Sequence, residues 1–121
     1  MSDELTEKII GAAVEVHRLL GPGLLESVYE EALCHELGLR QLEFERQKAI
    51  DVLYKGIRIQ GQRIDLVVEA QVVCEIKSMK GLPPVATAQV LSYLKSTGLR
   101  RALLINFGES KLVQGIKRIS L

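Results

Sequence analysis

Three charged residues lie inside one strongly apolar stretch of the sequence. Asp65, Glu75 and Lys77 are embedded among valine, isoleucine and leucine between positions 63 and 77. A charged side chain among apolar neighbours is costly unless it is paired or binds a cation. Carboxylates are the hard oxygen ligands that Mg²⁺ or Mn²⁺ accept, and a nearby lysine offsets the charge of a phosphate. The residue types therefore favour metal-assisted chemistry on a phosphate ester.

The same stretch predicts a β-hairpin that brings the two carboxylates together. Apolar, β-branched residues flank the polar triplet Glu69-Ala70-Gln71 on both sides, which is typical of two strands joined by a turn. If the turn centres on Ala70, Asp65 lies opposite Glu75, with facing side chains about 4.5–5.5 Å apart. Because side chains alternate along a strand, Lys77 shares their face. The alternative is an edge hairpin whose charges form a solvated salt-bridge cluster, since this spacing also recurs by chance.

Four motifs resemble those of one nuclease superfamily. Ile64-Asp65 followed by Glu75-Ile76-Lys77 resembles the PD-(D/E)XK signature of the restriction-endonuclease-like superfamily, with Ile64 in place of the motif's proline. Gln89-Val90-Leu91-Ser92-Tyr93 is similar to the Gln-x-x-x-Tyr helix motif of several exonuclease branches. Gly23-Leu24-Leu25-Glu26-Ser27-Val28-Tyr29 matches the pattern that names the GxxExxY family, and Leu103-Leu104-Ile105-Asn106-Phe107-Gly108 resembles that family's late strand. The motifs occur in the right order over nearly the whole chain.

The resemblance implies a divalent-metal site with Mg²⁺ or Mn²⁺ as the cofactor. Asp65, Glu75 and Glu26 would hold one or two ions, and the carbonyl of Ile76 would add a ligand. Glu26 begins the second predicted helix, where the alternative role of a glutamate is to stabilise the helix start. Tyr29, one turn later, is expected to pack with its hydroxyl near the rim of the site.

The resemblance also assigns roles to residues around the metal. Lys77 would orient the attacking water or neutralise the transition-state charge, and Gln89 and Tyr93 would position water and phosphate. Many relatives carry a histidine three residues before the glutamine, whereas position 86 is alanine here, which argues against an accessory histidine. The implied function is metal-dependent hydrolysis of phosphodiester bonds in nucleic acid, with DNA as the expected substrate. The alternative is a nuclease fold that binds or scaffolds without turnover.

Length and composition predict one soluble domain over residues 1–121. Hydrophobic residues make up 47% and charged residues 26% of the chain, as in ordinary globular proteins. The apolar runs are too short to span a bilayer, and the acidic opening has no signal-peptide character, so a cytoplasmic protein without membrane partners is expected. Cys34 and Cys74 are expected to be reduced and packed as small apolar side chains. The sequence leaves a homodimer open.

Charge is distributed unevenly along the chain although the net charge is +1. Acidic residues dominate up to Glu45, and basic residues dominate from Arg46 onward. The basic half suggests a face for a polyanion, or else the two halves neutralise each other within the fold. Candidates for phosphate contact are Gln47 and Arg63 at the rim of the site, and the bases Arg100, Arg101, Lys111, Lys117 and Arg118, whose alternative role is to keep an edge of the sheet soluble.

The predicted elements define an α/β fold with a restriction-endonuclease-like core. Apolar residues at helical spacing predict two N-terminal helices, the first capped by Ser2 or Asp3 and ended by Gly21-Pro22-Gly23, the second closed by Gly38. Strands 44–54 and 57–68, with a bulge at Gly61, form an antiparallel meander with the hairpin. A crossover helix over 85–97 leads to a further strand over 100–107 that completes a mixed sheet, and residues 112–119 add a short last strand.

Overall fold

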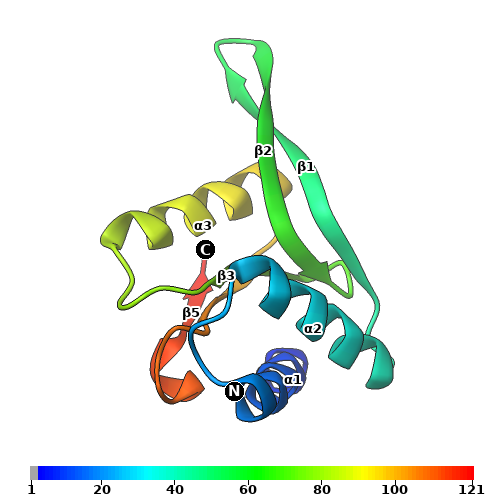
Figure 1. Ribbon diagram of the computed structural model, residues 1–121. Helices are drawn as coiled ribbons and strands as arrows, with labels where there is room; N and C mark the ends of the chain where they lie inside the picture. The colour runs from blue at the N-terminus through cyan, green and yellow to red at the C-terminus, as the bar shows by residue number, and fades with distance from the viewer. Residues whose placement is uncertain (1–2) are drawn as a thin grey trace.

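The computed structural model describes residues 3–121, so Ser2, the alternative cap of the first helix, lies outside the described residues. Within these described residues, three helices, a short 3₁₀ helix and five strands follow one another (Figure 1). They are α1 (Glu4–Leu20), α2 (Glu26–Leu39), β1 (Phe44–Tyr54), β2 (Ile57–Val68), β3 (Val72–Lys77), α3 (Pro84–Thr97), β4 (Arg101–Asn106), η1 (Leu112–Gly115) and β5 (Ile116–Ser120).

The five strands form one mixed sheet in the order β1-β2-β3-β4-β5. Only β3 and β4 run parallel, because α3 carries the chain from the end of one back to the start of the other; the remaining neighbours are antiparallel. This arrangement confirms the predicted α/β fold with its meander, crossover helix and completing strand. The last segment differs slightly from the prediction, since residues 112–115 form a 3₁₀ turn before β5 pairs with β4.

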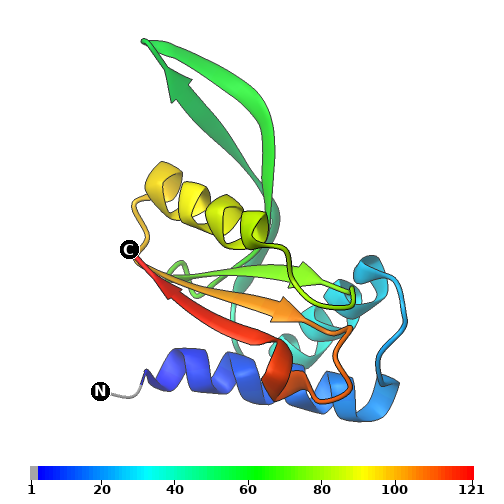
Figure 2. The same ribbon diagram turned by 90° about the vertical axis from the view of Figure 1, so that its left-hand side faces the viewer.

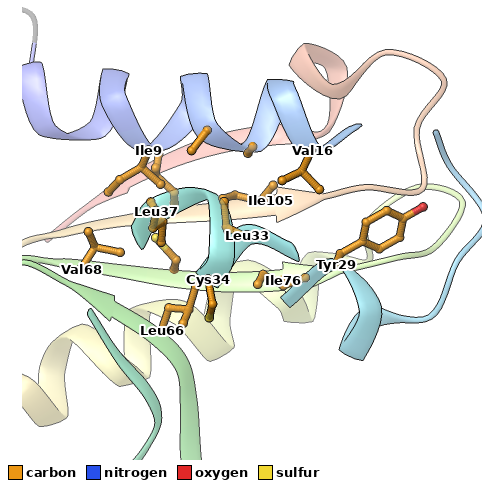
Figure 3. Close-up of a cluster of buried hydrophobic side chains, with 14 of the residues drawn as sticks. Ile9, Val16, Tyr29, Leu33, Cys34, Leu37, Leu66, Val68, Ile76 and Ile105 are labelled. Atoms are coloured by element: carbon orange, nitrogen blue, oxygen red, sulfur yellow. The ribbon is translucent and has the colours of Figure 1, made fainter. Parts of the chain in front are cut away.

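Helices cover both faces of the sheet. Figure 2 shows α1 below the sheet and α3 above it, with α2 beside α1. The side chains beneath the sheet form one apolar cluster with α1 and α2, part of which is drawn in Figure 3. A second cluster lies between the sheet and α3, and includes Val67, Val73, Val90, Leu94 and Leu104. Burial of these apolar faces, at roughly 25 cal/mol per Å², is what holds the layers together.

Local sequence signals set the ends of α1 and α3. The carboxylate of Asp3 accepts hydrogen bonds from the amides of Leu5 and Thr6, at 3.1 and 3.3 Å, which confirms its predicted role as the N-cap of α1. Proline at the first position of α3 fixes φ where no amide partner exists. Gly98 ends α3 in the left-handed conformation at φ 75°.

The loop after β3 is fastened to the end of β4 by a buried asparagine. The side-chain oxygen of Asn106 accepts from the amides of Met79 and Gly108, at 3.1 and 3.0 Å, and its amide nitrogen donates to the carbonyl of Met79 at 2.8 Å. Gly108 lies directly against the backbone of Met79, where a β-carbon would overlap it. The loop that follows Lys77 is therefore held in one position.

We predict that Gly108→Ala lowers the free energy of unfolding by about 1–3 kcal/mol, because the added methyl group must push the Met79 backbone away. The matched control is Gly38→Ala, a helical glycine with open space around its α-carbon, which should gain up to about 1 kcal/mol. Urea unfolding of both variants measures the difference. Equal stability of the two variants would contradict the close approach.

Candidate active site

Asp65 lies at the point where β2 separates from β3. The two strands pair only from Leu66 with Cys74 to Val68 with Val72, a register that centres on Ala70 as predicted. At the next position the ladder stops, and Oδ2 of Asp65 accepts a hydrogen bond from the amide of Ile76 at 2.8 Å. A side-chain carboxylate thus takes the place of a backbone carbonyl as the acceptor. This bond holds Asp65 beside Glu75 in the fork, which is the point where β2 and β3 separate.

Glu75 is the most unusual residue of the site. It is only 5% exposed, and its Oε1 is buried without any hydrogen-bond partner among the described residues. Its Oε2 lies 3.6 Å from the Nζ atom of Lys77, which is itself half-buried. A buried carboxylate oxygen without a donor costs roughly 1–3 kcal/mol or more, so this oxygen requires a proton or a cation. The structure therefore brings Asp65, Glu75 and Lys77 together as predicted from the sequence.

The two carboxyl groups impede each other's ionisation. Burial raises the pKa of Glu75 to about 8, with the negative charge of Asp65 as the next contribution, while the ammonium of Lys77 acts in the opposite direction. Burial also raises the pKa of Asp65, against the stabilising hydrogen bond from the amide of Ile76. Two acids that share one buried space hold a proton between them in the absence of a cation.

Glu30 of α2 is a site residue that the sequence reasoning missed. It is buried, and its Oε2 accepts from Nε of Arg46 at 2.6 Å. Its Oε1 accepts from the side chain of Gln47 at 2.8 Å, and the same Gln47 nitrogen lies 3.4 Å from Oδ1 of Asp65. The negative charge of Glu30 adds to the raised pKa of Asp65. A signal existed in the sequence: Glu30 precedes Leu33 and Leu37 at helical spacing and so lies on the buried stripe of α2.

Gln47 adopts an unusual backbone conformation opposite Asp65. It lies between the pairs Arg46 with Leu66 and Lys48 with Ile64, and its φ is 53° inside a β-strand. A non-glycine residue in the left-handed region costs of order 1–3 kcal/mol and persists where other contacts enforce it. The contact with Glu30 occupies the side chain that the sequence analysis assigned to the phosphate-facing rim.

Glu26 lies in the first turn of α2 and is exposed. Within residues 3–121 the structure gives its carboxylate no hydrogen bond or ion pair with a protein group. Tyr29, three residues later, is fully buried and stacks on Phe107, with ring centroids 4.5 Å apart. Its hydroxyl donates to the carbonyl of Gly21 and accepts from the amide of Leu24, so it fastens the loop before α2.

The predicted pair on α3 is also in place. The side-chain amide of Gln89 donates to the hydroxyl of Tyr93 at 2.8 Å, one helical turn away. Burial, followed by the negative charge of Glu75, raises the pKa of Tyr93 to about 12. The negative charge of Asp65 acts in the same direction as that of Glu75. Ala86, three residues before Gln89, is buried in the apolar cluster between α3 and the sheet.

The donor set fits one divalent cation with few protein ligands. Residues 3–121 contain no group of three or more histidine, cysteine or acidic side chains arranged to hold a metal. Two carboxylates are together, however, and the unpartnered Oε1 of Glu75 marks where positive charge is lacking. Mg²⁺ usually binds through one or two carboxylates and keeps several waters, so Asp65 and Glu75 with the carbonyl of Ile76 suffice.

Part of the basic half is used within the fold. Arg101 pairs with Asp3, Arg118 lies 3.5 Å from Glu7, and Arg46 bonds Glu30 and Glu31. These pairs join the acidic N-terminal part to the basic part that follows it. They therefore support the alternative in which the two halves neutralise each other. In the same described range, no helix is long and apolar enough to cross a membrane.

The raised pKa of Glu75 predicts a pH dependence of stability in the metal-free protein. A carboxyl group with a higher pKa when folded binds its proton more tightly in the folded state, so its contribution is complete below pH 4.5 and is lost as the pH rises through about 8. Each pKa unit is worth about 1.4 kcal/mol, so the free energy of unfolding should fall by on the order of a few kcal/mol between pH 5 and 8.5, and the raised pKa of Asp65 acts in the same direction.

Glu75→Gln should abolish most of this slope, while Glu43→Gln, at an exposed position, should retain it. Urea unfolding in the presence of a chelator over this pH range measures the effect. An unchanged slope in Glu75→Gln would show that the carboxyl titrates normally.

Comparison with known proteins shows to which family the chain belongs. The family model described as PD-(D/E)XK nuclease superfamily matches residues 3–119. Among solved structures, the crystal structure of SSO0001 is similar, with a TM-score of 0.58 and 24% sequence identity over 78% of this chain. The chain spans 48% of that protein's length, so this likeness concerns the fold alone. No curated protein matches the sequence. Since the family model covers almost every residue, the chain belongs to the PD-(D/E)XK nuclease superfamily.

Proposed function

We propose that the protein is a metal-dependent nuclease of the GxxExxY type, which hydrolyses phosphodiester bonds of nucleic acid, with DNA as the expected substrate. The observation that carries the proposal is the Oε1 atom of Glu75, which is buried and has no hydrogen-bond partner among the described residues. Glu75 lies in a fork with Asp65, and its other oxygen, Oε2, lies 3.6 Å from the Nζ atom of Lys77. Most buried side-chain oxygens in native proteins have a hydrogen-bond donor. A buried oxygen without a donor, next to a second carboxylate, instead favours the binding of a cation.

Asp65, Glu75 and the Ile76 carbonyl are the groups that would hold the cation. A divalent metal bound there supplies a water of lowered pKa and positive charge for the phosphate oxygens. Oδ2 of Asp65 accepts a hydrogen bond from the Ile76 amide, and its Oδ1, which lies 3.4 Å from the side-chain nitrogen of Gln47, would contribute to holding the cation. The N–H that binds Asp65 and the carbonyl proposed as a ligand belong to the same residue, Ile76.

Lys77 and the α3 pair act on the substrate. Lys77 is half-buried, with its Nζ atom 3.6 Å from Oε2 of Glu75, so its charge would lie within reach of a phosphate oxygen at the cation. A fixed positive charge that meets the transition state at a partly dry site contributes about 10²–10³-fold in rate. Tyr93 stays protonated because of its raised pKa, so its hydroxyl accepts from Gln89 and can donate to a phosphate oxygen.

Lys77→Ala should keep the fold and lower nuclease activity on DNA by about 10²–10³-fold in Mn²⁺ or Mg²⁺. The matched control is Lys80→Ala, an exposed lysine three residues later, which should retain activity within a few fold. Cleavage of a labelled duplex and single strand by highly purified protein measures both variants. If wild type, Lys77→Ala and Lys80→Ala cleave equally, the activity is a contaminant and the protein is a binding or scaffolding form of the fold.

Two glutamates of α2 are candidates to complete the metal site, and one pair of variants distinguishes them. Glu26 is the motif residue, whereas Glu30 is linked to Asp65 through Gln47. We expect Glu30→Gln to weaken Mn²⁺ binding about 10–100-fold, as loss of an outer-shell partner does, and Glu26→Gln to change it less than about 2-fold.

Isothermal titration with Mn²⁺ measures this difference independently of catalysis. The circular dichroism spectrum of each variant controls for folding, because Glu30 also pairs with Arg46. A larger loss in Glu26→Gln than in Glu30→Gln would return the role to the motif glutamate and reduce Glu30 to a structural ion pair.

A further inference from the structure

Arg63 of β2 is an exposed base two residues before Asp65. Within residues 3–121, no carboxylate forms an ion pair with its guanidinium. The bases nearest to it in β1 and β2 do have acidic partners, in the pairs Arg46–Glu30, Lys48–Glu45 and Arg58–Asp51. The charge of Arg63 is therefore not neutralised by an ion pair, and it is available to an anionic ligand.

The guanidinium of Arg63 is bonded to the residue that also contacts Asp65. Its Nη1 donates to the carbonyl of Gln47 at 3.4 Å, and the side-chain nitrogen of Gln47 lies 3.4 Å from Oδ1 of Asp65. Gln47 is the residue of β1 with a φ of 53°, a conformation that other contacts must stabilise. One residue of β1 thus contacts both a carboxylate of the site and the arginine beside it.

An arginine that is held through one nitrogen keeps its other donors for a ligand. A guanidinium carries five N–H donors in a planar fork. In the described part of the chain, Nη1 of Arg63 bonds the carbonyl of Gln47, and the other two nitrogens have no protein acceptor. Such a fork binds two oxygens of one phosphate at the same time, which a lysine cannot do. Arg63 therefore has the free donors of a phosphate-binding group.

The position of Arg63 along β2 suits the phosphate next to one that lies at the cation. Two residues of a strand advance about 6.6 Å, at about 3.3 Å per residue. Each strand of a duplex carries one phosphate per about 3.4 Å of helix axis, and the winding of the strand makes the direct separation of neighbouring phosphates larger than that. Lys77 lies on β3, across the fork from β2. Two bases, on the two strands that border the fork, can therefore bind consecutive phosphates.

The surface beyond Arg63 leaves room for a polynucleotide to continue. Arg63 belongs to the lining of a cavity of about 420 Å³ at Gly61, where the register of β1 and β2 shifts and φ is 124°. The shift confirms the bulge predicted at Gly61. Ala49 contributes only a methyl group to the lining and Gly61 no side chain, which keeps the cavity open. The lining contains one carboxylate, that of Asp51, and Arg58 lies 3.9 Å from it. This volume is in the range of pockets that hold small ligands, so a nucleoside fits there.

We propose that Arg63 binds the phosphate next to the one at the cation, so that the site takes polynucleotides in preference to isolated phosphodiesters. This inference rests on the proposed nuclease function and adds a substrate requirement to it, a second phosphate on the side of Arg63. Arg63 contributes to binding and not to the chemical step, because it contacts a phosphate that does not react. Its loss should therefore raise KM and leave kcat nearly unchanged.

The first test uses a thymidine dinucleotide, in which a single phosphodiester bond can be cleaved. It is compared with the same dinucleotide carrying a further phosphate at its 5′ or at its 3′ end. Wild type with Mn²⁺ should cleave one of the two phosphorylated forms with a kcat/KM about 10-fold higher than the plain form, as a hydrogen-bonded charge pair predicts.

Arg63→Gln should remove this preference and cleave all three dinucleotides alike. The matched control is Arg40→Gln, an exposed arginine that follows the end of α2 and pairs with Glu36, which should keep the preference. A wild type that cleaves the three dinucleotides equally overturns the proposal, and so does a preference that survives in Arg63→Gln.

The second test measures binding without cleavage. In the Lys77→Ala background, a short labelled single strand is titrated with protein at several NaCl concentrations and followed by fluorescence anisotropy. Adding Arg63→Gln should weaken binding about 10-fold and make the slope of log affinity against log salt shallower by about 0.7, the value for one phosphate contact on a single strand. Adding Arg40→Gln should change neither quantity.

Titration with Mn²⁺ checks whether Arg63 acts directly or through Gln47. Arg63→Gln should bind Mn²⁺ as wild type does, since the contact between Gln47 and Asp65 does not involve the arginine. A loss of Mn²⁺ affinity as large as the loss of strand affinity, or an unchanged salt slope, overturns the proposal. If wild type cleaves no dinucleotide and Arg63→Gln still flattens the salt slope, the nuclease function fails while the phosphate contact of Arg63 stands.

Discussion

The burial of Glu75 beside Asp65 is the constraint on which the rest of the structure depends. A sheet interior that contains two carboxylates must separate its strands there, and β2 does leave β3 immediately after Leu66. Oδ2 of Asp65 then accepts a hydrogen bond from the Ile76 amide, which has no backbone carbonyl of β2 opposite it. This N–H of β3 therefore keeps an acceptor. Among residues 3–121, the Oε1 of Glu75 remains without a hydrogen-bond donor. Binding a cation would relieve this cost, so stability and metal affinity are coupled through the same two side chains.

The surrounding contacts keep the fork open rather than letting it collapse. Gln47, in a strained left-handed conformation, bridges Asp65 to Glu30 of α2, and Arg46 neutralises Glu30 from the neighbouring position. On the other side of the fork, Asn106 fixes the loop that follows Lys77 against β4. These supports come from different elements, which explains how the two carboxylates keep their positions at an open site.

Sequence reasoning found what periodicity and local chemistry determine. The polar triplet around Ala70 predicted the hairpin register, Gly61 predicted the bulge, and the apolar spacing predicted the helices on their faces. It missed Glu30 because the motif drew attention to Glu26, one turn earlier, although the apolar stripe already placed Glu30 on the buried side of α2. The backbone of Gln47 lay beyond sequence reasoning altogether: glutamine carries no preference for positive φ, and only the tertiary contacts with Glu30 and Asp65 impose it.

One strand, β2, connects the site to an arm, which is the part of β1 and β2 beyond Gly61 that projects from the body (Figure 1). One twelve-residue strand contributes Val67 and Val68 to the core, Asp65 to the site, and Ile57 and Ile59 to the exposed apolar face. The bulge beside Gly61 separates these parts, because an extra residue alters the twist of the ribbon and lets the arm leave the plane of the sheet. The alternation of side chains is continuous in β1, so the face that packs on α3 at Ile50 must become the apolar face of the arm at Val52 and Tyr54.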